Sequence, residues 1–298
     1  MSSIPRNRPL SWILWHPHQG LWNARLLRTV KKVIPIRPIY RLVSRAIILI
    51  DTILLFTRAL NRRISKMGIA QVFSRTKVPP GLSLLYFDLG THKEARELSW
   101  MVEKVLPRLC DHFEAYGFEA ARECFEQAKA KFVGRENVRL IHRALCYELP
   151  ADGVVKLYKD SGAGLGNSLY RSFYAAYEEA PAVRLSGWLR ENNLHPESSI
   201  CLLRINIEGA EYDVIMDLVE NGLARQIDGY YGMWDDISKI DQQRDEMFRA
   251  FLAKHRIFPF AFNGRDFTAV LRMKCIEYDI KTQVQAGIRR IKKLASGA

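Results

Sequence analysis

The segment ICLLRINIEGAEY, residues 200–212, constrains the fold of this chain more than any other part of its sequence. Its mostly apolar first half predicts a buried strand, which runs directly into Glu208 and Glu211, two carboxylates separated by Gly-Ala. A carboxylate at the carboxyl end of a buried strand is costly unless a ligand or a partner satisfies it. We therefore expect the chemistry of this protein at this segment.

Strand-like and helix-like patterns alternate after the breaker cluster Pro79-Pro80-Gly81, which we interpret as the boundary between an appendage, 1–80, and a domain, 81–298. The expected strands are 84–88, 116–119, 138–145, 154–158, 200–206 and 227–233. The expected helices are 93–109, 121–131 and 211–220. This alternation predicts an α/β fold with a mainly parallel sheet.

The end of the domain has a different pattern. Residues 256–262 and 267–273 are expected to form an antiparallel pair of strands, joined by Asn263-Gly264. The basic tail 288–294 predicts a short helix, which is either a solvated surface or a second membrane contact.

The basic residues are concentrated at the start of the chain. Residues 1–80 hold 15 Lys and Arg against the single acid Asp51, a net charge of +14, whereas the whole chain of 298 residues carries +13. The other 218 residues therefore sum to −1. A basic excess confined to one end predicts an appendage that meets an anionic partner.

The most apolar run of this appendage is 46–57, which lies between two arginines. As a helix it is about 18 Å long, too short for a hydrocarbon core of about 30 Å. Extended, it has a narrow polar stripe rich in arginine, which is typical of a helix lying in a membrane interface. Trp12, Trp15 and Trp22 upstream favour the same headgroup level. A core helix or an oligomer contact has the same pattern and stays an alternative.

Other classes of partner and compartment are not expected. The arginines are interleaved with long aliphatic side chains and no nucleic-acid motif occurs, so we expect no nucleic-acid partner. Prolines interrupt the first 20 residues, so no signal peptide is expected. The five cysteines have no C-x-x-C pair, and no His and carboxylate cluster has metal spacing, so we expect reduced thiols and no metal. The expected location is the cytoplasm, with peripheral, monotopic attachment to an anionic membrane through residues 1–80.

Three strand ends carry residues suited to a ligand, because ligands of open parallel sheets bind beyond the carboxyl ends of the strands. The first expected strand ends in Asp88-Leu89-Gly90, where a glycine turn lets the backbone approach a ligand. The second ends in Glu119, a carboxylate that can hydrogen-bond ribose hydroxyls. The third ends at Asn206, just before Glu208 and Glu211.

Taken in order, these motifs resemble the FkbM family of S-adenosylmethionine-dependent methyltransferases, whose pattern runs from D-x-G-A-x-x-G through E-P to K-I-D-x-E-G-A-E. This chain has DLGTHKE at 88–94, FEA at 118–120 and RINIEGAE at 204–211. HRAL at 142–145 is similar to the family's strand with a terminal Ala-Leu, and GNSL at 166–169 to its serine-containing loop. The resemblance covers residues 83–235.

The resemblance implies a Rossmann-like methyltransferase fold that transfers a methyl group from S-adenosylmethionine to a hydroxyl. The implied acceptor is a sugar or glycan-like molecule, lipid-linked ones included. The implied cofactor-binding residues are Asp88 and Gly90 in the turn, Glu119 at the ribose, and Ala144 and Ser168.

The same resemblance implies the catalytic residues. Glu208 is the candidate general base or substrate orienter, and Asn206 is expected to hold the cofactor or the acceptor by hydrogen bonds. The alternative for Glu208 and Glu211 is a structural place in the first turn of the following helix, where the dipole favours carboxylates. For Glu119 it is a solvated helix start. His92 and His142 are weaker candidate bases.

The chain departs from the family pattern at Thr91, Glu94 and Asn206. A catalytically degenerate fold that serves as a membrane scaffold or partner-binding subunit is therefore the alternative function. An enzyme of similar fold that uses a different nucleotide is a third hypothesis. The glycine-rich stretch 162–168 and the residues 234–236 are further candidates for ligand contact, or else a surface loop and a polar turn.

Overall fold

The computed structural model describes residues 76–160, 166–170, 176–232, 237–257, 260–261 and 269–296. The expected amphipathic helix of the appendage lies outside these residues. The chain divides into two compact units, 76–259 with 280–298 and 1–75 with 260–279. Of the second unit the structure describes β9 (Phe260–Ala261) and the start of α12 (Ala269–Ala295). Along the described residues, no helix has both the length and the apolar character that a membrane crossing requires.

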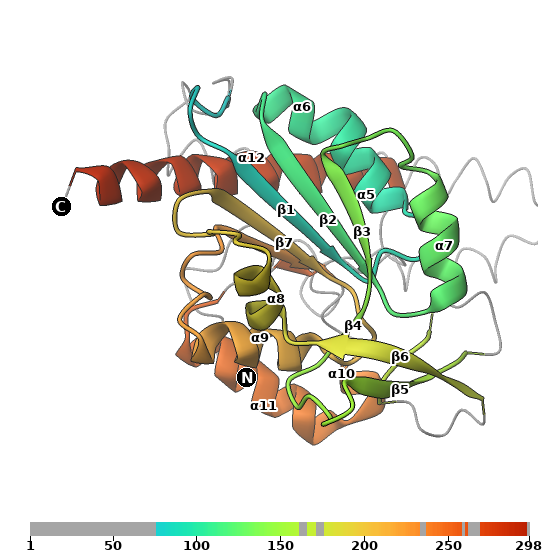
Figure 1. Cartoon of the computed structure of the whole chain (residues 1–298). Coiled ribbons are helices and arrows are strands. Elements are labelled where there is room, and N and C mark those ends of the chain that lie inside the picture. Colours follow the sequence, from blue (N-terminus) through green and yellow to red (C-terminus); the bar gives the residue numbers. More distant parts are fainter. Residues whose placement is uncertain are drawn as a thin grey trace, which may run out of the picture. The chain divides into compact units, whose positions relative to one another are not determined.

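Five parallel strands form the centre of the larger unit, in the order β3-β2-β1-β7-β8 (Figure 1). Their bounds are β1 (Leu84–Leu89), β2 (Phe113–Glu119), β3 (Val138–His142), β7 (Ile200–Ile205) and β8 (Gly229–Gly232). Every residue of β1 and β7 is buried, as expected for central strands that are covered on both faces. The prediction of an α/β fold with a mainly parallel sheet is confirmed, and the sheet is of the Rossmann-like type.

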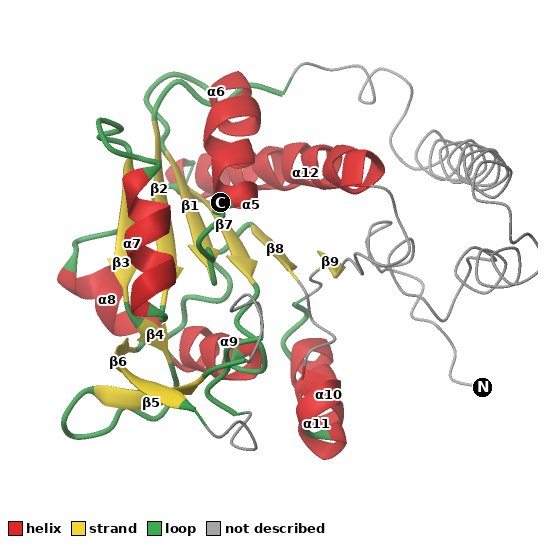
Figure 2. Cartoon of the chain, turned by 90° about the vertical axis from the view of Figure 1, so that its right-hand side faces the viewer, coloured by secondary structure: helices red, strands yellow, loops and turns green. Residues whose placement is uncertain are grey.

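Helices cover both faces of this sheet (Figure 2). On one face Trp188 of α8 (Leu185–Glu191) meets Phe87, Tyr116 and Phe118 edge-on, with ring centroids 6.5, 5.3 and 4.9 Å away. On the other face, a Cβ on Gly117 would lie 2.9 Å from Leu98 of α5 (Arg96–Trp100), so α5 packs directly on the backbone of β2. The other helices that follow β1 and β2 are η1 (Met101–Val105), α6 (Leu106–Leu109) and α7 (Arg122–Ala130).

The order of the strands creates a switch point. From β1 the chain builds β2 and β3 on one side, and it later returns to place β7 and β8 on the other side. The crevice between such strands, beyond their carboxyl ends, is the usual ligand site of open α/β sheets. The sequence places Gly90 and Asn206 directly after β1 and β7, on either side of this crevice.

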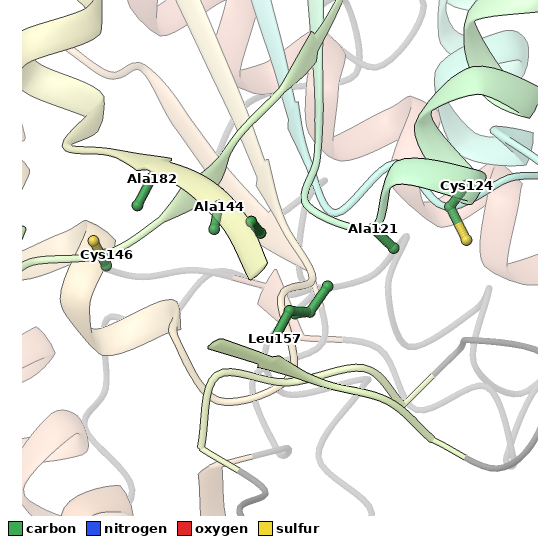
Figure 3. Packing of buried hydrophobic residues seen from close by; sticks show 7 residues of the cluster. Ala121, Cys124, Ala144, Cys146, Leu157 and Ala182 are labelled. Carbon is green, nitrogen blue, oxygen red and sulfur yellow. The ribbon is translucent and has the colours of Figure 1, made fainter. Parts of the chain in front are cut away.

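A second, smaller sheet follows β3. It consists of β4 (Ala144–Leu145), β6 (Tyr177–Val183) and β5 (Val154–Tyr158) in that order. The expected strand 138–145 is therefore broken at Arg143, and its two parts belong to different sheets. Small side chains and one leucine fill the space between the second sheet and the start of α7, in a cluster (Figure 3) of Ala121, Cys124, Ala144, Cys146, Leu157, Ala180 and Ala182.

Several elements differ from the expectations. α12 begins at Ala269, inside the expected strand 267–273, so that prediction is wrong; a short apolar run fits a strand and a buried helix equally well. In 256–262 only Phe260–Ala261 is a strand among the described residues. The expected short basic tail helix is the end of a helix of 27 residues.

The strand β6 was not expected because it contains Pro181, which cannot donate to a sheet ladder. β4 pairs only with Ala182 and Val183, so Pro181 lies beyond the end of that pairing. The helices α8, α10 (Ile237–Ile240) and α11 (Gln242–Lys254) were also not expected.

Candidate functional site

A pocket lies at the carboxyl ends of β1, β2 and β7, beside the second sheet. The space among its lining residues is about 670 Å³, open solvent at its mouth included. Five of the seven residues expected at the site line it: Gly90, Glu119, Ala144, Asn206 and Glu208. Asp88 and Ser168 are not among the lining residues.

Asp88 lies behind the β1 turn. Its side chain is fully buried and paired with Arg204 of β7, whose Nη1 also donates to the carbonyl of Gly90 at 3.2 Å. Burial raises the pKa of Asp88, and the Arg204 guanidinium opposes that rise. Asp88 therefore contacts Arg204, which holds the carbonyl of Gly90, whereas Gly90 itself lines the pocket.

Gly90 is required by the approach of two strand ends. Its φ is 86°, and a Cβ there would lie 1.9 Å from the carbonyl oxygen of Asn206. Any side chain would force the turns after β1 and β7 apart. The glycine thus lets these two turns meet at the floor of the pocket.

Glu119 connects two loops at the pocket wall. Its carboxylate accepts the backbone N–H of His92 at 2.7 Å and that of Ala121 at 2.9 Å. Burial raises the pKa of Glu119, and the N–H groups of Ala121 and His92 oppose the rise. The solvated helix start that we considered for Glu119 does not fit, because the carboxylate is held at the pocket and α7 begins only at Arg122.

The two departures in the β1 loop do not reach the pocket. Thr91 is buried, and its hydroxyl donates to the carbonyl of Asp88 at 3.1 Å. Glu94 is exposed and pairs with Arg96 at 2.6 Å. Neither residue lines the pocket, so these substitutions leave its space open.

Asn206 and Glu208 have the features of a ligand-binding turn. The side-chain Oδ1 of Asn206 is buried and has no hydrogen-bond partner within the described part of the chain. Such an unsatisfied group is rare in proteins, and a ligand that supplies a donor would explain it. Glu208 has φ 49°, a left-handed conformation that is uncommon for residues with a Cβ and that clusters at functional sites.

Glu211 has the structural role that we considered for it. It is the first residue of α9 (Glu211–Glu220) and is fully buried. Its carboxylate accepts the backbone N–H of Gly209 at 2.8 Å and that of Ile207 at 3.3 Å. Glu208 precedes the helix and lines the pocket, so the two carboxylates have different surroundings.

Ser168 supports the Glu208 turn from outside the pocket. Its side chain is buried, and the hydroxyl donates to the carbonyl of Glu208 at 2.5 Å. Its neighbours Asn167 and Leu169 line the pocket. In the described structure the Ser168 hydroxyl contacts the backbone of Glu208, and its expected contact with the cofactor stays a prediction.

Two other lining residues, Arg143 and Leu157, were not singled out from the sequence, whereas Asn167 and Leu169 lie in the segment 166–169 that resembles the family's loop. Arg143 stands between β3 and β4, and its Nη1 donates to the carbonyl of His142 at 2.9 Å. A charged residue in the middle of an expected buried strand was a signal that the strand is interrupted. Leu157 lies in the expected strand 154–158, but the pairing of the second sheet that brings it to the pocket has no local signal.

Two further stretches were candidates for ligand contact. Most of the stretch 162–168 and all of 234–236 lie outside the described residues. Within the described ranges, no group of three His, Cys, Asp or Glu side chains is placed to hold a metal ion. Four cysteines are buried and free: Cys110, Cys124, Cys146 and Cys201.

Two comparisons with known proteins give no match. No protein-family model matches the chain, and no curated protein is significantly similar to it. The functional interpretation therefore depends on the geometry of the pocket and on the resemblance of the three motifs.

Proposed function

We propose that this chain is an S-adenosylmethionine-dependent O-methyltransferase that acts on a hydroxyl of a sugar or glycan-like acceptor. One observation carries the proposal: the turns after β1, β2 and β7 meet at one pocket, at the switch point of a parallel sheet. Each of these turns contains one of the three motifs that resemble the FkbM family. On this proposal the α/β sheet is that of a Rossmann-like methyltransferase.

The pocket has suitable groups for the cofactor, which when bound supplies a methyl group activated by its sulfonium charge. Gly90 would let the backbone approach it closely. Each oxygen of Glu119 accepts one backbone N–H and keeps a further acceptor position for the ribose hydroxyls. Ala144 and Leu157 would provide an apolar wall for a flat ring.

Asn206 and Glu208 would act on the reacting side. The Oδ1 of Asn206, which has no partner in the part of the chain that the structure describes, would accept a hydrogen bond from a donor on the cofactor or the acceptor. Glu208 would orient the acceptor hydroxyl and take its proton as charge develops on the oxygen. The left-handed backbone at Glu208 supports this role, since strained residues persist where function requires them.

A methyl-transfer assay with radiolabelled S-adenosylmethionine and a panel of methyl glycosides tests the proposal. Glu208→Gln is expected to lower kcat by about 100-fold or more, in the range of a lost general base. Glu191→Gln, a change at an exposed carboxylate, is the control. Unchanged turnover of Glu208→Gln at saturating acceptor would remove Glu208 from the role of base.

We also propose that the protein binds an anionic membrane at its cytoplasmic face. There it would reach acceptors that include lipid-linked glycans. The net charge of +14 in residues 1–80 supports peripheral attachment of a cytoplasmic protein. Flotation of the full-length chain with anionic liposomes tests this part. A chain that stays at the bottom of the gradient contradicts it.

The alternative is a catalytically degenerate scaffold or partner-binding subunit. It was motivated by the departures at Glu94 and Asn206. Glu94 lies outside the pocket, and Asn206 lines it with a side-chain oxygen that has no partner among the described residues, so neither departure closes the pocket to a ligand. The third hypothesis is an enzyme of similar fold that uses a different nucleotide. A folded chain that shows no thermal shift with S-adenosylmethionine but a shift with another nucleotide would favour it.

A further inference from the structure

A continuous series of contacts leads from the Glu208 turn to helices outside the pocket. The hydroxyl of Ser168 donates to the carbonyl of Glu208. The oxygen of that hydroxyl accepts the backbone N–H of Tyr170 at 3.1 Å. The hydroxyl of Tyr170 donates to Asp213 of α9. None of Ser168, Tyr170 and Asp213 lines the pocket.

Arg244 of α11 completes the series. Its Nη2 donates to Asp213 at 2.5 Å and to the hydroxyl of Tyr170 at 3.3 Å. The guanidinium also lies over the rings of Tyr170 and Tyr212, 4.6 and 5.4 Å from their centroids. We call Ser168, Tyr170, Asp213 and Arg244 the clamp.

The clamp is built to hold one geometry. Asp213 is 4% exposed, so its charge depends on the two donors that reach it. Burial raises its pKa, and Tyr170 and Arg244 oppose the rise. The ring of Tyr170 also closes over the turn, because a Cβ on Gly209 would lie 3.5 Å from its Cδ2.

A residue with a Cβ remains in the left-handed region only where its surroundings hold it. We propose that Tyr170 is a positioning residue for Glu208: tied to Asp213 and Arg244, it fixes Ser168, which holds the carbonyl of Glu208 in its left-handed turn. The inference rests on the proposed role of Glu208 as the group that faces the acceptor. It makes the reactivity of the pocket depend on four side chains outside it.

The experiment compares Tyr170→Phe and Ser168→Ala with a matched control. Tyr147→Phe also removes a hydrogen bond from tyrosine to a carboxylate, that of Tyr147 to Glu220 at 2.6 Å, but at an exposed site. Hydrogen exchange of peptides that cover residues 205–212 is measured on the full chain, together with the thermal midpoint. We expect exchange there to become about tenfold faster in both clamp variants, with a lowered midpoint in Tyr170→Phe because buried Asp213 loses a donor, and to stay unchanged in Tyr147→Phe.

Methyl transfer to the methyl glycosides gives the second readout. We expect Tyr170→Phe to lower kcat by about 10- to 100-fold, as loss of a supporting contact does, with unchanged affinity for S-adenosylmethionine. Added to Glu208→Gln, it should cost nothing further, because the two residues act as a unit.

The outcomes are distinguishable. Exchange in Tyr170→Phe and Ser168→Ala equal to that of the wild type overturns the proposal, as does an effect of the same size in Tyr147→Phe. A kcat loss that adds fully to that of Glu208→Gln also overturns it. If the wild type transfers no methyl group, the proposed function fails, while the exchange measurement still decides whether the clamp holds the turn.

Discussion

Two ion pairs of aspartate and arginine, one buried and one partly buried, lie at opposite ends of the same sheet and differ in how fully their polar atoms are hydrogen-bonded. Asp228 precedes β8 and pairs with Arg290 of α12, with Nε to Oδ1 at 2.8 Å and Nη2 to Oδ2 at 2.9 Å. The other donors of Arg290 reach the carbonyls of Pro196, Glu197 and Ser199. All three guanidinium nitrogens and both carboxylate oxygens of this pair therefore have partners.

The pair at the carboxyl end is less complete. Asp88 and Arg204 are 1% and 4% exposed, yet Asp88 Oδ2 and Arg204 Nε have no hydrogen-bond partner among the described residues. The same holds for Oδ1 of Asn206, two residues further along the chain. The amino-end pair joins α12 to the sheet with all its atoms paired, whereas each partner of the carboxyl-end pair keeps an unsatisfied atom. The contrast concerns the two pairs, since the buried side-chain oxygens of Gln226 and Gln283 near the amino end also have no partner among the described residues. Departures of this kind from full satisfaction are expected where a protein binds a ligand.

Replacement of the guanidinium at the carboxyl end should have the largest effect. Arg204→Met leaves Asp88 buried and unpaired, which costs about 3–5 kcal/mol of unfolding free energy. It also removes the donor to the carbonyl of Gly90, so binding of S-adenosylmethionine should weaken as well. Urea unfolding and calorimetry measure the two effects. A loss of stability with unchanged affinity for S-adenosylmethionine would show that the Asp88–Arg204 pair does not support the pocket. That result would contradict the proposed difference between the two ends of the sheet.

The matched change at the amino end should affect stability alone. Arg290→Met removes the charged partner of Asp228 and leaves it the backbone N–H of Cys201, 2.9 Å away, as a donor. We expect a loss of about 3 kcal/mol, at the lower end of the range because the Arg290 side chain is 20% exposed. Affinity for S-adenosylmethionine should not change. Arg289→Met, at an exposed neighbour, should stay within about 0.5 kcal/mol of the wild type. Weaker binding by folded Arg290→Met would break the proposed separation of the two ends.

Glu119 should make ligand binding at the carboxyl end depend on pH. Burial raises its folded-state pKa, so the carboxylate takes up a proton at a higher pH than an ordinary glutamate. As the pH falls through this raised value, the charged acceptor for the ribose hydroxyls is lost and affinity for S-adenosylmethionine should fall. Calorimetry at a series of pH values should show this fall in the wild type and a flat profile in Glu119→Gln.

The stability linkage of Glu119 has the opposite sign. A raised folded-state pKa favours the protonated form of the folded chain. The contribution of Glu119 to stability is therefore greatest below its ordinary pKa and declines as the pH rises through the folded value. The stability of Glu119→Gln relative to the wild type should increase over this interval, and a constant difference in urea midpoints would contradict the assignment.

The smallest effect on stability is expected for Asn206→Ala. The change removes a buried oxygen that has no partner among the described residues, so the unfolding free energy should stay within about 1 kcal/mol of the wild type. Affinity for S-adenosylmethionine, or for the acceptor, should fall about tenfold, the value of one hydrogen bond at a buried group. A large loss of stability with unchanged binding would show that Asn206 has a structural role.

Local patterns predicted the elements whose signal is contained in a few residues. Two strands and one helix were expected within one residue of their bounds, because apolar runs and turn residues delimit them. These are the strands Val154–Tyr158 and Ile200–Ile205 and the helix Glu211–Glu220. Since parallel strands end at one edge, Gly90 and Glu119 could be assigned to a common site from their positions alone.

The parts that depend on long-range pairing could not be predicted. Asp88 and Arg204 are 116 residues apart, and no local pattern near either residue predicts their ion pair. Because of this pair, Asp88 faces Arg204 and is not among the residues that line the pocket. Arg143 and Leu157 line the pocket only because a second sheet forms after β3, through partners that lie far along the chain. Tertiary packing, not local propensity, decided these positions.

Titration calorimetry of the full-length chain with S-adenosylmethionine tests most directly whether the carboxyl end of the sheet is a cofactor site. We expect saturable binding at a single site, weakened by Asn206→Ala and Glu119→Gln and unchanged in Arg290→Met. Absence of binding by the folded wild-type chain, or weaker binding only in Arg290→Met, would contradict the account.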